Sequence, residues 1–454
     1  MRTYNIAEGL NVNVTIMSNP YGLPLDALFA MAARINKKRA FLFVSKILGK
    51  HIPVNPYVSL LSGAALSLMI VADREEARRE RASELLQDVL HALAHPEEAK
   101  QVYDKVMLDE ITVRTPLTII GFAETATALG HSVFHVFADG ATYLHTTREF
   151  IPERTSVLNF DEEHSHAVAH RCYVGKDNSL MGNGPIVLVD DEITTGKTAL
   201  NIIRDIHAKY PRDHYYIASL LDWRVPEDEH KVLLLEQELG IHIHSLSLIK
   251  GVIEVEGSPD LSDAISDPVL CDEQCTQTSI EYIYLDDIFN LVDVRSESED
   301  GWINHSPYIT ATGRFGITSD QRREIDNSIE TAAEQLRKHR ISANTLCLGT
   351  GEFMYVPMRI AAALGNGVAY HSTTRSPIHA INTEQYAIQS GNSYPSPDDT
   401  SVMNFIYNVT FGQYEELFLF LERDVIQARI EPMLDVFRTK GFKQINVVVA
   451  AGNG

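Results

Sequence analysis

Cysteine is scarce in this sequence, with four among 454 residues. So low a count argues against a disulfide-stabilised secreted domain and favours a reducing compartment. Cys271 and Cys275 stand in "CDEQC", which does not have the two-residue spacing of a metal site, and no second Cys/His pair lies nearby. We interpret these two cysteines as ordinary thiols.

Basic residues are also in short supply. The 39 Lys and Arg residues are outnumbered by 61 Asp and Glu, which gives a formal net charge of −22. This balance argues against non-specific binding to nucleic acid or to an anionic membrane. A protein this acidic that handles a phosphorylated substrate must supply cations at the site itself, as a metal ion or as local Lys and Arg.

Long apolar runs are rare too. The beginning, "MRTYNIAEGLNVNV", lacks the apolar core of a secretory signal. The longest apolar stretch, residues 54–72, is interrupted by one Asn and three Ser and stands alone, so it predicts a buried helix rather than a membrane span. We therefore expect a cytoplasmic protein.

What the sequence does contain is a series of short apolar runs rich in Val, Ile and Leu. Such runs predict strands of a mostly parallel sheet that is buried on both faces. Helical patterns lie between them at 197–210 and 227–240, and the charged region 72–110 is also helical by its period. The alternation predicts an α/β fold. The expected strands are 117–122, 132–137, 186–190, 214–223, 242–249, 345–349 and 445–450.

The length suits two domains rather than one core. A polar segment without apolar period, residues 292–313, marks the clearest change in composition. We predict a first domain over 1–290, with an accessory segment at about 1–110 and a core at about 111–290. A linker at 291–304 and a second α/β domain at 305–454 follow.

The most informative motif is "GPIVLVDDEITTGKTAL", residues 184–200. Its strand ends in Asp190 and Asp191, at the sheet edge where open α/β folds bind ligands. The turn into the next helix offers hydroxyls and backbone N–H groups to a phosphate; its residues are Thr194, Thr195, Gly196, Lys197 and Thr198. A nucleoside-triphosphate loop would need glycine at position 191, where the chain has aspartate. The acids must therefore face something uncharged or cationic, such as a ribose diol or hydrated Mg²⁺.

This motif resembles the phosphoribosyl-diphosphate (PRPP) signature of the type I phosphoribosyltransferases. The resemblance implies that Asp190 and Asp191 bind the ribose hydroxyls and that residues 194–198 hold the 5-phosphate. It also implies Mg²⁺ carried mainly by the substrate, with the two acids as candidate ligands. Two departures are visible: Glu192 stands where the family has a small or aliphatic residue, and Lys197 adds a cation.

An earlier turn, Gly121 to Thr125 with Glu124, resembles the diphosphate-binding loop of the same family. The next strand ends in "YLHTTRE", where Thr147 is a candidate PRPP contact and Arg148 is placed to neutralise diphosphate oxygens in bidentate fashion.

Between this strand and the acids lies a polar interval with three histidines, His164, His166 and His170. His166 is our candidate acid or base, because imidazole titrates near neutrality. A metal site and plain exposed loop histidines are the alternatives. The resemblance implies a nucleobase-like acceptor, held by the 150–180 loop and by Lys46 and His51.

Residues 347–380 contain "GTGEFMY" and "STTRSP". These strings resemble the TRSP domain, which follows an orotate-phosphoribosyltransferase-like domain in tellurium-resistance gene clusters. The resemblance implies a Mg²⁺-dependent phosphoribosyltransferase, commonly a homodimer, that makes a nucleotide-like metabolite linked to tellurium resistance. A non-catalytic regulator that binds PRPP or a nucleotide is the alternative. Neither the acceptor nor the direction of the reaction is indicated.

The chain also repeats itself. Gly-x-x-Glu at 121–124 is followed by Thr-Thr-Arg at 146–148, and Gly-x-x-Glu at 349–352 is followed by Thr-Thr-Arg at 373–375, with Glu-to-Thr separations of 22 and 21. We hypothesise that the second domain is a diverged copy of the first sheet; coincidence is the competing account. Its last strand would replace the acids by Ala450 and Ala451. The copy would keep an anion site at Gly349, Gly351, Glu352, Thr374, Arg375 and Ser376.

Overall fold

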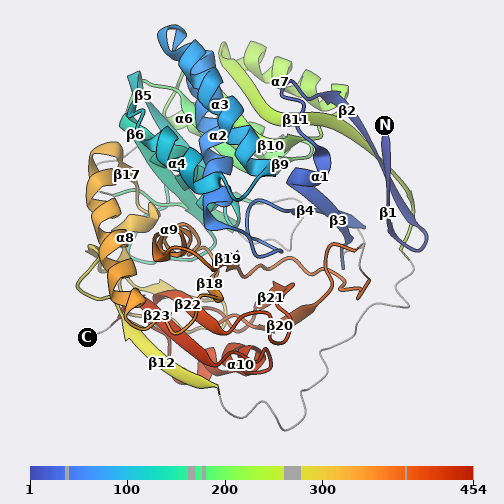
Figure 1. Ribbon diagram of the computed structural model, residues 1–454. Helices are drawn as coiled ribbons and strands as arrows, with labels where there is room; N and C mark the ends of the chain where they lie inside the picture. The colour runs from blue at the N-terminus through green and yellow to red at the C-terminus, as the bar shows by residue number, and fades with distance from the viewer. Residues whose placement is uncertain (36–39, 162–168, 176–179, 260–277, 384–385, 453–454) are drawn as a thin grey trace.

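A ten-stranded sheet forms one half of the molecule (Figure 1). The computed structural model describes residues 1–454 except 36–39, 162–168, 176–179, 260–277, 384–385 and 453–454. The centre of the sheet is parallel, in the order β6–β5–β9–β10–β11. These strands are Phe137–Thr147, Ile111–Gly121, Ile186–Ile193, His214–Asp222 and His242–Gly257.

Antiparallel strands extend this centre at both edges. On the β11 side lie β2 (Leu10–Ser18) and β1 (Arg2–Ala7). On the β6 side lie β8 (Ala169–Cys172), β7 (Leu158–Asp161) and β17 (Ile317–Thr318). A separate hairpin, β3 (Phe29–Ala33) with β4 (Phe41–Ser45), follows the short helix α1 (Leu25–Leu28).

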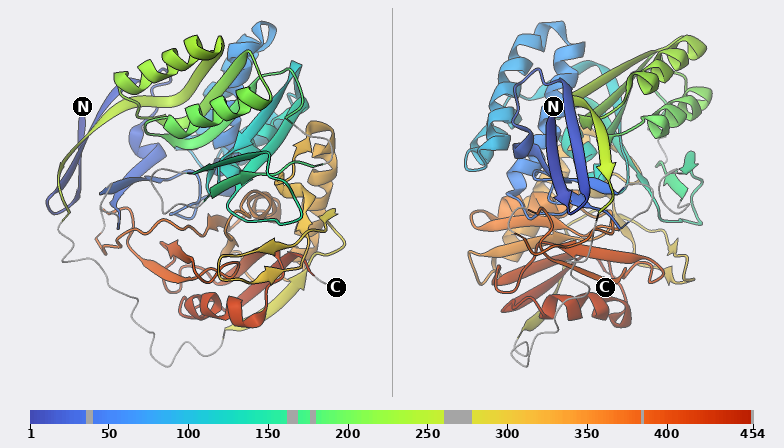
Figure 2. Two further views of the ribbon diagram at one scale, coloured as in Figure 1. Left: turned by 180° about the vertical axis from the view of Figure 1, so that it is seen from behind. Right: turned by 90° about the vertical axis from the view of Figure 1, so that its right-hand side faces the viewer.

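Helices cover both faces of the first sheet (Figure 2). The larger core cluster takes in α2 (Pro56–Arg74), α3 (Arg79–Ala94), α4 (Ala99–Met107) and α5 (Ala126–His135), with a 3₁₀ turn η1 (Glu76–Arg78) before α3. The smaller cluster takes in α6 (Lys197–Lys209) and α7 (Pro226–Leu239). Each strand between them is buried on both sides, which explains its continuous apolar sequence.

Helix α2 confirms the buried helix expected at 54–72. Among the described residues it is the one helix long and apolar enough to cross a membrane, yet 83% of its apolar window is buried inside this structure. It packs on α3, α5 and the strands β10 and β11. The region 72–110 is helical as predicted, but it is broken into η1, α3 and α4 and ends where β5 begins at Ile111.

A second, five-stranded sheet is parallel throughout, in the order β12–β23–β22–β18–β19. Its strands are Ser279–Tyr284, Gln444–Ala451, Glu416–Arg423, Thr345–Gly349 and Val368–Ser372. Helices α8 (Arg322–Arg337) and α9 (Tyr355–Leu364) pack together, and α10 (Gln427–Arg438) belongs to a separate core cluster. In Figure 1 this sheet lies below the first one, and α9 lies between the two.

Short elements connect the sheets. Three two-stranded ribbons pair β13 (Leu291–Val292) with β16 (Tyr308–Ile309), β14 (Ser296–Glu297) with β15 (Ile303–Asn304), and β20 (Gly391–Pro395) with β21 (Met403–Tyr407). Two 3₁₀ turns, η3 (Thr310–Thr312) and η4 (Ser319–Gln321), precede α8.

The expected domain boundary at residue 290 lies too late in the chain. Strand β12 comes before it yet pairs in parallel with β23, so the chain has already entered the second sheet by Ser279. The expected linker at 291–304 carries three of the short ribbon strands. The chain then returns to the first sheet, where β17 pairs with β6. The two halves are thus interleaved rather than joined end to end.

Six of the seven expected strands are confirmed. The exception is 132–137: its first four residues lie in α5, and β6 begins only at Phe137. Helix α5 is buried on all sides, so its sequence carries no amphipathic period to separate it from a buried strand. Strand β22 was not predicted, although all eight of its residues are buried.

The two sheets share their strand order. The first runs β6–β5–β9–β10, the second β19–β18–β22–β23, and in each the chain visits the strands in the same sequence. This is what a diverged copy requires. The expected match of the last strand to the acidic strand is wrong, however, because the neighbour of β18 is β22. Gly121 pairs with Val189 and Gly349 with Phe420, so two residues further on Asp191 corresponds to Glu422.

Candidate active site

A cavity of about 270 Å³ opens where β5, β6 and β9 of the first sheet end. Three groups of residues line it, from the strand ends, from the N-terminal segment and from the second half of the molecule. They are Phe122, Ala123, Glu124, Thr125, Ala126, Arg148, Asp190, Asp191, Glu192 and Thr194; Arg34, Leu42, Phe43, Lys50 and His51; and Arg375 and Ser376. This cavity lies at the strand ends where the sequence places its candidate site.

The paired acids lie at the end of β9 and face the cavity. The carboxylate of Asp190 accepts a hydrogen bond from the backbone N–H of Asp191 at 2.9 Å. The ammonium of Lys50 lies 3.9 Å from Asp191. Lys50 comes from the N-terminal segment, so its cation reaches the acids from a part of the chain that the sequence motif does not include.

The turn after β9 leads into α6. Gly196 has φ 70° and immediately precedes the helix, a left-handed conformation that glycine adopts at little cost. Thr194 lines the cavity. The other predicted phosphate contacts, Thr195, Gly196, Lys197 and Thr198, are not among its described lining residues, although they form the N-terminal turn of α6 next to it.

The loop after β5, residues 122–125, forms the floor of the cavity. Gly121 is required before it, because a Cβ there would lie 2.4 Å from the carbonyl oxygen of Ala126. The N–H of Ala123 donates to Thr146 Oγ1 at 2.9 Å. In the described part of the chain, Glu124 Oε1 and Thr125 Oγ1 are buried without a hydrogen-bond partner. Such buried polar atoms are normally satisfied, so they indicate room for a polar ligand.

At the end of β6, Arg148 faces the cavity and Thr147 faces the second half of the molecule. Arg148 lines the cavity, while its backbone N–H donates to Glu352 Oε1 of the second half at 2.8 Å. Thr147 is buried away from the cavity, where its hydroxyl accepts a hydrogen bond from Arg314 at 2.5 Å. Thr147 therefore contributes to the contact between the halves rather than to the cavity wall.

The expected histidines have different fates. His164 and His166, the candidate acid or base among them, lie outside the described residues. His170 is buried on β8, stacked on Phe160, with Nδ1 at 3.4 Å from Thr146 Oγ1, so it is not an exposed loop histidine.

His51 does line the cavity. It is buried, and neither ring nitrogen has a hydrogen-bond partner within the described residues. Burial, with nearby Lys50, lowers the pKa of His51 well below its ordinary value, so its imidazole is neutral near pH 7. Lys46, expected beside His51, instead donates to the carbonyl of Asp26 at 2.7 Å and lines a different cavity of about 600 Å³.

The residues that the sequence suggested for a separate anion site in the second half lie in different places. Glu352 accepts from Arg148 N–H and pairs with Arg314 at 2.6 Å. Thr374 accepts from the N–H of Ser376 at 3.1 Å. Gly349 and Gly351 shape the loop after β18, where a Cβ at Gly349 would lie 2.6 Å from the carbonyl of Phe353. Arg375 and Ser376 line the cavity of the first sheet, and Arg375 also lines a neighbouring cavity of about 90 Å³.

A divalent cation fits this cavity only in partnership with a substrate. Within the described residues, no group of three or more His, Cys, Asp or Glu could hold a metal ion. Mg²⁺ commonly keeps several waters and binds through one or two carboxylates together with substrate phosphates. The carboxylates that line the cavity are those of Glu124, Asp190, Asp191 and Glu192.

Sequence reasoning missed the cavity residues Arg34, Leu42, Phe43 and Lys50, and it assigned Arg375 to a different site. Lys50 and Phe43 come from the segment of which only Lys46 and His51 were expected near the acceptor, and no short motif marks these two residues. Arg375 was recognised as an anion-binding candidate from its Thr-Thr-Arg string, but its position depends on how the halves dock, which no local pattern records.

A family model described as phosphoribosyl transferase matches residues 28–252, and one described as TRSP domain C terminus to PRTase_2 matches residues 311–437. No curated protein matches the sequence.

Several solved phosphoribosyltransferases are similar over part of the chain. The adenine phosphoribosyl transferase of Trypanosoma brucei, complexed with AMP, pyrophosphate and ribose-5-phosphate, is 12% identical, over 33% of this chain and 66% of its own, with a TM-score of 0.24. That of Giardia lamblia, complexed with 9-deazaadenine, is 18% identical, over 36% and 84%, with a TM-score of 0.23. The orotate enzyme of Aeropyrum pernix is 18% identical, over 34% and 73%, with a TM-score of 0.19. The chain thus spans 66% of the length of the trypanosomal enzyme.

Proposed function

Because the chain belongs to the phosphoribosyl transferase family, with a TRSP domain after it, we propose that it transfers ribose 5-phosphate between PRPP and a nucleobase-like acceptor. In the synthetic direction the bond from C1 of the ribose to diphosphate oxygen breaks, and the diphosphate leaves with the electron pair. A bond from C1 to an acceptor nitrogen forms, and the N–H proton of the acceptor passes to a base. The observation that carries this proposal is the cavity shared by the paired acids, the loop after β5 and Arg148.

The acids suit the ribose rather than its phosphates. Carboxylates accept hydrogen bonds from hydroxyls but repel phosphate, and Asp190 and Asp191 stand side by side at the end of β9. Their negative charges also stabilise the positive charge that develops at C1 as the diphosphate leaves. Preorganised charge of this kind is often the largest catalytic contribution. The N-terminal turn of α6, next to Thr194, is the proposed place for the 5-phosphate.

The diphosphate is proposed to lie on the loop after β5. Thr125 Oγ1 there has no partner within the described residues and can donate to a diphosphate oxygen, whereas the unpartnered Glu124 Oε1 can only accept and suits a cation. Arg148, from the end of β6, is the cation beside this loop. Mg²⁺ would neutralise diphosphate charge when bound, and Glu124, Asp190 and Asp191 are the residues that would share it.

The acceptor is proposed to bind against the hairpin β3–β4. Leu42 and Phe43 line the cavity, and Phe43 is held by stacking on Trp223 with ring centroids 4.7 Å apart. A flat heterocycle suits an aromatic wall of this kind. The neutral imidazole of His51 can hydrogen-bond to the edge of such a ring in either tautomer.

The test is release of diphosphate from PRPP and Mg²⁺ in the presence of a panel of purine and pyrimidine bases, including adenine, hypoxanthine and orotate. We expect release with at least one base, lost in Asp190→Asn/Asp191→Asn and retained in Asp205→Asn. Asp205 is a matched control because it is exposed on α6, away from the cavity. Tight PRPP binding without release for any base would favour the regulatory alternative.

Three further parts of the proposal rest on the sequence and on its resemblance to the TRSP proteins. They are a cytoplasmic location, a homodimer, and a role for the product in tellurium resistance or a related stress. Growth of a deletion strain on tellurite, with and without the Asp190→Asn/Asp191→Asn variant, tests the last. We expect the wild-type gene alone to restore growth.

A further inference from the structure

The two halves meet through equivalent residues, each of which contacts the other half. Glu124, in the loop after β5, accepts a hydrogen bond from the backbone N–H of Arg375 at 3.2 Å. Glu352, in the loop after β18, accepts one from the backbone N–H of Arg148 at 2.8 Å. Since the two glutamates occupy the same place in their sheets, as do the two arginines, this exchange is the signature of an approximate two-fold arrangement.

The hydrogen bonds within the two halves also correspond. Thr146 Oγ1 accepts from Ala123 N–H at 2.9 Å, and Thr373 Oγ1 accepts from Gly351 N–H at 3.0 Å. The hydroxyl of Tyr143 donates to a carbonyl at the beginning of α5. That of Tyr370 does so to the carbonyl of Met354, just before α9.

The helices that follow these loops meet at the centre of the arrangement. Helix α5 packs against α9, and the rings of His131 and Tyr355 stack with centroids 3.6 Å apart. The loops and the first helices of both halves therefore correspond as whole units, not only as short strings.

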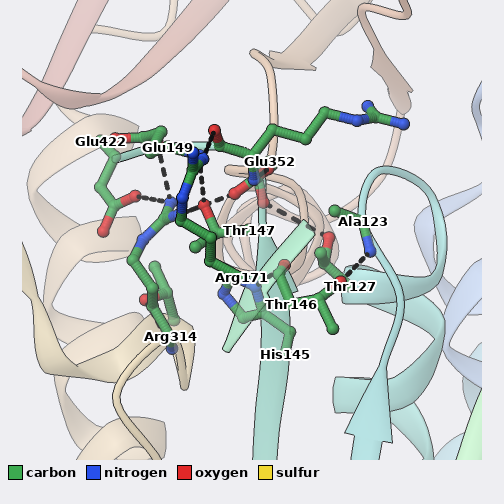
Figure 3. A network of polar contacts seen from close by, with 12 residues as sticks. Ala123, Thr127, His145, Thr146, Thr147, Glu149, Arg171, Arg314, Glu352 and Glu422 are labelled. Carbon is green, nitrogen blue, oxygen red and sulfur yellow. Dashed lines mark hydrogen bonds and ion pairs between the residues drawn. The ribbon is translucent and has the colours of Figure 1, made fainter. Parts of the chain in front are cut away.

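The equivalent site of the second half is filled by a side chain of the protein. The guanidinium of Arg314 contacts Glu352 at 2.6 Å, Glu422 at 2.9 Å and Thr147 Oγ1 at 2.5 Å (Figure 3). Glu149 lies 3.3 Å from it. The cavity left there is about 20 Å³, against about 270 Å³ in the first half.

The open site of the first half differs from the closed one in having no side chain, among those the structure describes, at the place of Arg314. Glu124 and Asp191 occupy the positions of Glu352 and Glu422, but an open cavity lies where Arg314 would be. Lys50, at 3.9 Å from Asp191, is a much looser partner than Arg314 is to Glu422. Asp191 therefore faces an open cavity where its counterpart Glu422 faces a buried guanidinium.

Arg375 adds a cation from the other half to a cavity that Arg34, Lys50 and Arg148 also line. Its backbone is fixed by Glu124, and its side chain is half-buried on the cavity wall. Within the described residues the guanidinium has no hydrogen-bond or ion-pair partner. Its positive charge acts on the neighbouring Asp398, where it opposes the rise in pKa that burial causes. A guanidinium placed in this way is well suited to bidentate binding of phosphate oxygens.

We infer that the TRSP half is a built-in partner whose own site is closed by Arg314 and which lends Arg375 to the open site as a diphosphate-binding residue. This inference rests on the proposed function. Diphosphate is assigned, rather than the 5-phosphate, because Arg375 is bonded to the loop after β5, whereas the 5-phosphate belongs at α6. Arg148 and Arg375 then bind one ligand from the two halves.

The experiment is titration calorimetry of the full chain with PRPP, with inorganic diphosphate and with ribose 5-phosphate, each with Mg²⁺. The variants are Arg375→Gln and Arg375→Lys. Arg438→Gln, on the solvent side of α10, is the control for the same change in charge within the same half. Because only the backbone of Arg375 bonds to Glu124, the contact between the halves survives these substitutions, and an unchanged Tm checks this.

Arg375→Gln is expected to lower the affinity for PRPP and for diphosphate about tenfold or more, the usual effect of losing a hydrogen bond to a charged group. Ribose 5-phosphate is expected to bind within about twofold of wild type, and Arg375→Lys to fall between. Diphosphate affinity unchanged in Arg375→Gln would overturn the inference and leave the proposed function standing. Equal losses for diphosphate and ribose 5-phosphate would also overturn it, because they would indicate a general disturbance. Failure of the folded wild type to bind PRPP would instead overturn the proposed function, and the inference with it.

Discussion

Arg314 is the residue on which the closed half of the molecule depends most. It is 1% exposed, and its guanidinium is surrounded by Glu149, Glu352 and Glu422. A buried charge without its partner is strongly unfavourable, whereas an exposed ion pair contributes little. Burial of the carboxylates around Arg314 is therefore tolerated only while the guanidinium compensates their charge.

We expect Arg314→Met to lower the free energy of unfolding by about 3–5 kcal/mol, the usual cost of removing one partner of a buried ion pair. Urea unfolding followed by circular dichroism measures it. Arg337→Met is the control, because Arg337 pairs with Glu330 at the surface of α8. A loss of less than about 1 kcal/mol, the range of surface pairs, would contradict the role assigned to Arg314.

Glu352 makes the fold sensitive to acid. Burial by itself raises the pKa of Glu352, but Arg314 and the donors of Thr147 and Arg148 outweigh it and lower the pKa from 4.5 to about 2. A carboxyl whose pKa is lowered on folding stabilises the fold above its unfolded pKa. This contribution is lost as the pH falls from about 4.5 towards 2.

The corresponding prediction compares the wild type with Glu352→Gln. Near neutral pH the wild type should be more stable, and its advantage should shrink as the pH is lowered from 4.5 to 2. Chemical unfolding at a series of pH values measures the difference. An advantage that stays constant over this range would contradict the lowered pKa of Glu352.

At the scale of elements, the loop after β5 depends on the absence of a side chain at Gly121. A Cβ there would lie 2.4 Å from the carbonyl of Ala126, so the loop or α5 must move to admit it. We expect Gly121→Ala to reduce stability by about 1–3 kcal/mol, as overpacking does, and to reduce diphosphate release by displacing Glu124 and Thr125. Gly182→Ala is the control, since its Cβ would meet nothing within 4 Å. Wild-type stability and activity in Gly121→Ala would contradict the tight packing described for this loop.

Elements with a local signal were predictable and those defined by packing were not. The acidic strand was found because its turn sequence is unusual, and α2 because its apolar run is long. By contrast, α5 and β22 are buried throughout, and a buried helix and a buried strand look alike in sequence. The counterpart of β9 was assigned to the last strand because β22 was missed, and only the pairing of Gly349 with Phe420 corrects it.

The same limit applies to the candidate site. Asp190, Asp191, Glu124, Thr125, Arg148 and Thr194 could be placed together because all lie at or just after the carboxyl ends of strands of one parallel sheet. Lys50, Phe43 and Arg375 reach the cavity across long sequence separations. Their positions depend on tertiary docking, for which short motifs carry no information.

At the scale of the whole molecule, the second half stands where the second subunit of a two-fold dimer would stand. The open site therefore takes its partner residues, Arg375 and Ser376, from its own chain. If the protein forms a homodimer, dilution will dissociate it into monomers, which light scattering can follow. We expect the specific activity to stay constant through this dissociation. A proportional loss of activity on dilution would contradict a site completed within one chain.

The central claim is that one chain holds one open PRPP site and one closed counterpart. Titration calorimetry of the wild type with PRPP and Mg²⁺ tests it most directly, with Asp190→Asn/Asp191→Asn as the variant. The account predicts Mg²⁺-dependent binding of one PRPP per chain, abolished in the variant. No binding by the folded wild type, or two equivalent sites per chain, would contradict it.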